Sequence, residues 1–220
     1  MTSVVLLGGG GHASDVLGAI EAVNAQQNQR GDNATKIRVE AVLDEGEIEL
    51  SRFENRAVSS IGQVKDIGDL SVDYYIAAVG YPSGRKALAE IGSQHGLEPL
   101  SIVHPRAWVP EDCQVGSGVI VLANASLSPL ITLLDHCYVS HGVNVGHDTI
   151  VGAFASIMPG ACISGDVLLG EGCLIGSGAV VLQGLRVGTG STVGAGAVVT
   201  SDVPEGATVM GMPARVKGAG

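Results

Sequence analysis

The sequence predicts two parts, a small parallel α/β domain over residues 1–102 and a parallel β-helix over residues 103–220. In the first part, apolar runs alternate with helical patterns, which is typical of a parallel sheet with crossover helices. In the second part, an aliphatic residue recurs at every sixth position without a slip. An α-helix repeats at about 3.6 residues and an ordinary strand at 2, so neither explains a strict period of six.

The α/β domain is expected to begin with the apolar run SVVLLG, which a stretch of four glycines then ends. Its expected elements, in order, are a strand at 3–8, a helix at 13–23, strands at 37–44 and 74–80, and a helix at 84–96. The polar stretch at 24–36 is expected to form a surface loop.

The β-helix is predicted from 17 positions, six residues apart from Val103 to Val199, that all hold Val, Leu or Ile. Three hexads make one triangular coil, and stacked coils bury the aliphatic side chains in columns. Glycine and other small residues recur at the remaining hexad places, where they suit tight corners. We expect five to six coils over residues 103–203, followed by a terminal loop with a frayed end.

Composition excludes several classes of protein. The net charge of −10 argues against a nucleic-acid partner, since phosphate binding needs clustered Lys and Arg. No apolar run is long enough for a membrane span. The N-terminus lacks the basic region of a signal peptide, so a cytoplasmic location is expected. The four cysteines, which lack CxxC spacing, are expected to be small buried residues rather than disulfides or zinc ligands.

The glycine-rich turn is the first candidate for chemistry. Gly8, Gly10 and Ala13 fit the G-x-G-x-x-A pattern of Rossmann-like domains, between a strand and a helix, where backbone N–H groups attract phosphate. Asp44 and Glu45 end the next strand, where an acid could bind a ribose or a base. The domain is too small for a full dinucleotide fold, which favours a mononucleotide or nucleotide sugar. A tight turn that only packs helix on strand is the alternative.

Two histidines, His141 and His147, occupy the same place in successive hexads. Both side chains should project outward on different faces of the prism, so they cannot converge on one ion within one chain. A metal between subunits of a trimer, as in hexad-repeat carbonic anhydrases, and a solvated surface residue are the alternatives. His141 has Gly142 beside it and Pro159 one coil later, neither of which would support a catalytic imidazole.

His147 differs because Asp148 follows it directly, and a carboxylate beside an imidazole can fix the tautomer and raise basicity. One coil later, 18 residues on, lies Gly165. A glycine stacked on a histidine leaves an open pocket and an accessible backbone N–H. A general base next to a backbone donor suits acyl transfer, since one takes a proton and the other stabilises the oxyanion.

The ordered motifs LLGGGGHASDV, VLDEG, AAVGYPSGR, SHGVNVGHDTIVGAF and GMPARV resemble the bacterial sialic-acid O-acetyltransferase and nucleotide-amino-sugar N-acetyltransferase family. The resemblance covers nearly the whole chain. It implies that the β-helix is left-handed and forms a homotrimer. It also implies that acetyl-CoA lies in the groove between neighbouring β-helices, and that the α/β domain binds the nucleotide sugar.

Residue by residue, the resemblance makes His147 the catalytic base, Asp148 the acid that tunes it, and Gly165 the backbone donor near the acetyl carbonyl. For substrate and cofactor it implies two further sets. Gly10, Gly11, His12, Asp44, Glu45 and Gly80 match nucleotide-sugar contacts, and Ser156, Gly165, Ser177 and Ala195 fall at coenzyme A positions. Many members carry a second histidine where this chain has Ser156, which departs from the family pattern.

The leading hypothesis is therefore an enzyme that uses acetyl-CoA to acetylate the C4 amine of a nucleotide-linked 4-amino-4,6-dideoxy sugar, such as a UDP-linked sugar or GDP-perosamine. No metal is expected. O-acetylation of sialic acid is the alternative within the same chemistry, since nothing in the sequence separates amine from hydroxyl acceptors. A non-catalytic ligand-binding or scaffold trimer is the alternative from another class.

Overall fold

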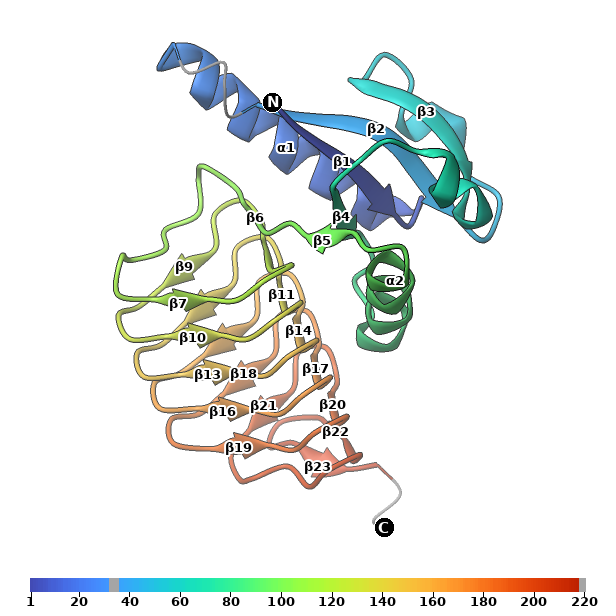
Figure 1. Ribbon diagram of the computed structural model, residues 1–220. Helices are drawn as coiled ribbons and strands as arrows, with labels where there is room; N and C mark the ends of the chain where they lie inside the picture. Colours follow the sequence, from blue (N-terminus) through green and yellow to red (C-terminus); the bar gives the residue numbers. More distant parts are fainter. Residues whose placement is uncertain (32–35, 218–220) are drawn as a thin grey trace.

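The computed structural model describes residues 1–31 and 36–217, with an α/β domain at one end of a tall stack of coils (Figure 1). The α/β domain has one parallel sheet in the order β3-β2-β1-β4-β5. Its strands are β1 (Thr2–Leu7), β2 (Ile37–Asp44), β3 (Val58–Gln63), β4 (Tyr74–Ala77) and β5 (Glu98–Pro99). Alternate residues of β1 face α1 (Gly11–Gln29) on one side and α2 (Pro82–Gln94) on the other.

Several parts of the α/β domain differ from the expectation, among them the two-residue strand β5, which no apolar run indicated. Helix α1 runs to Gln29, so the first residues of the expected loop at 24–36 are helical, and 32–35 lie outside the described residues. Strand β3 was not expected, because it lies at the sheet edge, and most of its side chains are exposed and give no apolar run. Two 3-10 helices, η1 (Leu50–Arg52) and η2 (Val64–Asp69), were also not expected.

The coils place very short strands on three sheets, which we call the first, second and third faces. The first face comprises β6 (Ile102–Val103), β8 (Ile120–Val121), β11 (Tyr138–Val139), β14 (Ser156–Ile157), β17 (Leu174–Ile175), β20 (Thr192–Val193), β22 (Thr208–Met210) and β23 (Arg215–Val216). The second comprises β9 (Ser126–Leu127), β12 (Asn144–Val145), β15 (Cys162–Ile163), β18 (Val180–Val181) and β21 (Val198–Val199). The third comprises β7 (Gln114–Val115), β10 (Thr132–Leu133), β13 (Ile150–Val151), β16 (Leu168–Leu169) and β19 (Arg186–Val187).

Neighbouring coils pair in parallel with a shift of 18 residues, as in Val139↔Ile157 and Val151↔Leu169, so the predicted parallel β-helix is confirmed. The hexad aliphatic residues from Val121 to Val199 are buried in one continuous core. Val115 is 40% exposed, because it lies on the edge strand of the third face, where no earlier coil covers it. At Gly152 an added Cβ would lie 2.6 Å from the backbone of Gly170, so the next coil leaves room only for glycine.

The end of the chain is more ordered than the expected terminal loop. Strand β22 continues the first face in parallel with β20, and β23 turns back to pair with it antiparallel. The residues at 218–220, where a frayed end was expected, lie outside the described residues.

The four cysteines are free. Cys137 and Cys173 are buried as expected, and burial raises the pKa of each thiol to about 12. Cys113 is half-buried. The expectation is wrong for Cys162, which is exposed, because it takes the outward-facing place on β15.

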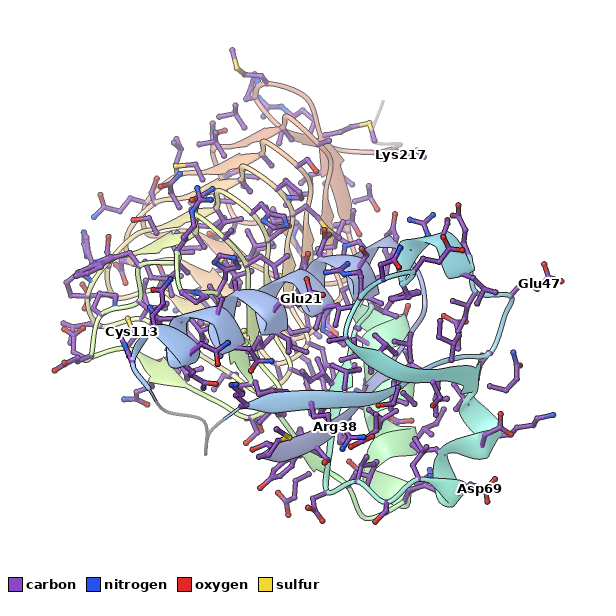
Figure 2. All side chains as sticks on the ribbon, turned by 90° about the horizontal axis from the view of Figure 1, so that it is seen from above. Glu21, Arg38, Glu47, Asp69, Cys113 and Lys217 are labelled. Atoms are coloured by element: carbon purple, nitrogen blue, oxygen red, sulfur yellow. The ribbon has the colours of Figure 1, made fainter. Side chains whose placement is uncertain are left out.

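Helix α1 joins the two parts of the molecule. Its apolar residues Val16, Leu17 and Ile20 share one core with strand β1 and with Ile120 and Tyr138 of the first face. Figure 2 shows α1, with Glu21 labelled, crossing in front of the coils, and Arg38 on the neighbouring strand β2. Within residues 1–31 and 36–217, no helix combines the length and apolar character needed to cross a bilayer.

Candidate functional site

The turn after β12 brings His147 and Asp148 together. His147 Nδ1 lies 2.7 Å from Asp148 Oδ2, and both side chains are about half exposed. Asp148 has a φ of 57°, a left-handed conformation that aspartate tolerates better than most residues. Because the carboxylate accepts a hydrogen bond from Nδ1, the proton is assigned to that nitrogen and Nε2 is left as the basic atom.

Gly165 lies against this imidazole, one coil later. An added Cβ at Gly165 would be 2.6 Å from His147 Nε2, so only glycine leaves the ring its position. The Gly165 N–H donates to no acceptor in the described part of the chain. Its place in the hexad lies between the coil-to-coil hydrogen bonds, one of which runs from Asp166 N to His147 O. The corner therefore combines a base with an unused backbone donor.

A groove of about 530 Å³ lies on the first face, where the α/β domain meets the coils. His12 and Asp15 of α1 line it at the domain side. Ser177 and Ala195, the expected coenzyme contacts, line it along the coils. The structure thus brings one expected nucleotide-sugar residue, His12, together with two expected coenzyme residues.

His147 does not line this groove. It lies at the corner between the second and third faces, where Asp148 borders a smaller depression of about 280 Å³ with Asp166 and Arg186. A single chain therefore does not bring the expected base together with Ser177 and Ala195.

His141 lies in the groove instead, and it has a neighbour that the sequence did not indicate. Its Nε2 is 3.8 Å from Asp15 Oδ1, a carboxylate that the α/β domain supplies. The residues next to His141 in its own hexad and in the next coil gave no sign of this neighbour, because Asp15 is remote in sequence.

The glycine-rich turn has the expected strand–turn–helix context. Gly10 and Gly11 are exposed at the start of α1. Asp44 shapes the turn, since its Oδ2 accepts a 2.5 Å hydrogen bond from Gly9 N, and its Oδ1 accepts one of 2.9 Å from Gly46 N. Glu45 is exposed and borders a separate depression, so the two acids do not act at one point.

His12 is held between Gly80 and Tyr138. Its ring packs so closely on Gly80 that no Cβ would fit there, and it meets the Tyr138 ring edge-on at a centroid distance of 5.4 Å. Burial lowers the pKa of His12. Asp15 opposes this shift, whereas the charges of Arg85 and His141 add to it. The structure thus brings the predicted residues His12 and Gly80 into direct contact.

Ser156 has a different position from the one expected. It is fully buried, its Oγ donates to Gly80 O at 2.7 Å, and Arg85 Nη2 donates to it at 2.9 Å. Its hydroxyl therefore serves the junction between the α/β domain and the coils rather than facing a coenzyme. Sequence reasoning missed Arg85, whose only signal is its place in the motif AAVGYPSGR.

Across residues 1–31 and 36–217, no three His, Cys, Asp or Glu side chains come together in a way that could hold a metal ion. The alternative of a metal between subunits is not tested by one chain.

Known proteins resemble this chain in sequence and in fold. The bacterial transferase hexapeptide model (six repeats) matches residues 148–183 and 166–201. The acetyltransferase domain of PglB from Neisseria gonorrhoeae, solved with acetyl coenzyme A, is 31% identical, with a TM-score of 0.81 over 97% of this chain and 98% of that one. The chain belongs to the bacterial hexapeptide-repeat transferase family. PerB from Caulobacter crescentus, solved with CoA and GDP-perosamine, is 27% identical, with a TM-score of 0.85 over 99% and 98% of the two chains.

A curated member of the family also matches. GDP-perosamine N-acetyltransferase of Escherichia coli O157:H7 is 35% identical over 101 residues. This match spans 43% of each protein, less than half the length of that relative.

Proposed function

We propose that this chain is an acetyl-CoA-dependent N-acetyltransferase acting on the C4 amine of a nucleotide-linked 4-amino-4,6-dideoxy sugar. The observation that carries the proposal is the corner at His147. There the imidazole is hydrogen-bonded to Asp148 at 2.7 Å and lies against Gly165, which has no side chain. Likeness to two proteins named for GDP-perosamine favours that sugar over a UDP-linked one and an amine over the hydroxyl of sialic acid.

In the proposed reaction the lone pair of the uncharged amine attacks the thioester carbonyl carbon of acetyl-CoA. A C–N bond forms, the C–S bond breaks, and His147 Nε2 takes the proton that the amine loses and returns it to the departing thiolate. Asp148 stabilises the imidazolium that exists between these steps. The Gly165 N–H donates to the oxyanion of the tetrahedral intermediate. Holding both substrates in register supplies much of the remaining rate.

Residues 1–102 would bind the nucleotide sugar, and residues 103–220 would carry the acetyl donor. The proposed nucleotide-sugar contacts are Gly10, Gly11, His12, Asp44, Glu45 and Gly80. The exposed start of the long helix α1 supports a phosphate position at Gly10 and Gly11. Ser177 and Ala195 are proposed to contact the pantetheine arm, since they line the groove that also holds His12.

We further propose that the β-helix is left-handed and that three copies assemble side by side, as the family resemblance implies. Two observations support the assembly. His147 and the groove lie on different faces of one chain, so a neighbouring copy would have to supply the base. Beside His147 on the third face, Ile150 and Leu168 are 42% and 38% exposed, as expected of a surface that another copy covers. The cytoplasmic location stays a prediction.

The test is release of the free thiol of CoA from acetyl-CoA across a panel of GDP- and UDP-linked 4-amino sugars, with sialic acid included. We expect turnover with a nucleotide 4-amino sugar, highest for GDP-perosamine, and an acetamide in the product by mass spectrometry. Turnover with sialic acid alone would replace the proposal with O-acetylation. Failure to bind or use acetyl-CoA with every acceptor would favour a non-catalytic trimer.

A further inference from the structure

Arg85, in the first turn of α2, joins the α/β domain to the coils without lining the groove. The guanidinium is completely buried and donates six hydrogen bonds, all to uncharged oxygens. These run from Nε to His136 O (2.7 Å), from Nη1 to Val79 O (2.9 Å) and Gly80 O (3.0 Å), and from Nη2 to Phe154 O (2.7 Å), Ala155 O (3.0 Å) and Ser156 Oγ (2.9 Å). Burial lowers the pKa of Arg85 to about 10, so the group stays charged at neutral pH.

A buried charge is costly unless it is well hydrogen-bonded, so this arrangement tolerates little movement. The acceptors come from both parts of the molecule. Two lie in the segment after β4, and the others belong to the β-helix. Arg85 therefore fixes how the α/β domain sits on the coils.

The same guanidinium contacts both surfaces that enclose His12. On one side, Gly80 O accepts hydrogen bonds from Arg85 Nη1 and from Ser156 Oγ, and the His12 ring packs on Gly80 itself. On the other side, Arg85 Cζ lies 5.7 Å from the centroid of the Tyr138 ring, which meets His12 edge-on. Arg85 and Ser156, which do not line the groove, therefore contact the residues that enclose His12.

We infer that Arg85 and Ser156 are positioning residues that set the orientation of His12 and thereby the binding of the nucleotide sugar. The inference rests on the proposed function for its substrate. It assigns their effect to the sugar side of the groove alone. Arg85 bonds to the coils through residues 136 and 154–156, whereas Ser177 and Ala195, the proposed coenzyme contacts, lie on later coils that it does not touch.

A residue that merely ties two domains together would act differently, and the chain offers a matched control. Lys86, next to Arg85 on α2, also joins the β-helix, through a 3.0 Å ion pair between its Nζ and Glu171 Oε1. Both side chains of this pair are about half exposed, and Lys86 Nζ also lies 5.7 Å from the centroid of the Phe154 ring. Among the described residues, no hydrogen bond, ion pair or ring contact joins either side chain to Gly80, Tyr138 or His12. Lys86→Ala removes a junction contact without changing the surroundings of His12.

The experiment compares Ser156→Ala with Lys86→Ala in the full-length protein. Ser156→Ala removes one of the two donors to Gly80 O, and we expect KM for the nucleotide amino sugar to rise about five- to tenfold, as loss of a buried hydrogen bond does. KM for acetyl-CoA should stay unchanged.

The ring signals of His12, assigned by NMR with labelled histidine, should shift in Ser156→Ala and stay in place in Lys86→Ala. Arg85→Lys, if it folds, should raise KM for the nucleotide amino sugar more than Ser156→Ala does.

Equal rises in both KM values, or an unmoved His12 signal with an unchanged KM, would overturn the inference. The NMR comparison needs no turnover, so it separates this inference from the proposed function. Suppose that the wild-type protein acetylates no nucleotide sugar, but the His12 signal shifts in Ser156→Ala. The proposed function would then be wrong, and the positioning role would still be supported.

Discussion

The corners that carry His141 and His147 have the same backbone conformation but different surroundings. Each histidine is followed by a residue in the left-handed region, Gly142 at φ 65° and Asp148 at φ 57°. At the first corner that residue has no side chain, and among the described residues the carboxylate paired with the imidazole is that of Asp15 in the α/β domain, 3.8 Å away. At the second corner the left-handed residue itself supplies a carboxylate at 2.7 Å.

The comparison shows how one repeat can give two histidines different chemistry. The hexad determines that both side chains point outward. The residue at the left-handed position and the residue one coil later decide whether the imidazole has a partner and room for a substrate. Pro159 follows His141 by one coil, whereas Gly165 follows His147.

The largest effect is expected when each imidazole is removed in turn. His147→Asn should lower kcat by about 100-fold or more, because general-base catalysis is lost. His141→Asn, the matched control one hexad away, should affect kcat much less. The measurement is the rate of thiol release with saturating acetyl-CoA and amino sugar. Equal losses in the two variants would mean that the wrong histidine has been assigned as the base.

A smaller loss is expected when only the partner of the base is changed. Asp148→Asn should lower kcat about tenfold or more, because an amide neither secures the Nδ1–H tautomer nor stabilises the imidazolium. Asparagine tolerates the left-handed backbone at this position, so the turn should persist. The same thiol assay measures the effect, with the melting temperature as a check on folding. An unchanged kcat would show that the carboxylate is not needed.

The smallest of the three effects is expected at Gly165. In Gly165→Ala the new methyl group would lie 2.6 Å from His147 Nε2 and push the ring aside, which should lower kcat about three- to tenfold. Alanine occupies the same hexad place at Ala153 and Ala195, so the coil itself accepts the change. Stability should therefore stay close to that of the wild type, as thermal unfolding would verify. Wild-type kcat in this variant would contradict a tight fit between the ring and Gly165.

Much of the fold could be predicted, because the periodic residues report on their own local structure. The aliphatic residue of each hexad predicted the coils, and the apolar runs of β1, β2 and β4 predicted a parallel sheet. Strand β3 could not be predicted, since an edge strand with exposed side chains has no apolar pattern. The strands β22 and β23 were missed because they lie beyond the last regular hexad.

Part of the candidate site could also be predicted from the sequence, and part could not. The contact between His147 and Asp148 and the stacking of Gly165 follow from neighbours in sequence and from the 18-residue coil, so they could be predicted. The resemblance placed Ser156 at a coenzyme position, but its surroundings depend on how α2 docks on the coils. Arg85 and Gly80 approach it from about 70 residues away, and no local pattern reports such a contact.

Periodicity and adjacency along the chain indicated the winding of the coils, the outward direction of both histidines, and the pairing of one of them with a carboxylate. All three depend on interactions between residues that are adjacent or a fixed period apart. The groove that His12, Asp15 and His141 share with Ser177 and Ala195, and the buried Arg85 behind it, are visible only in the folded chain. The reason is physical: the docking of one domain on another depends on side chains that meet only after each domain has folded.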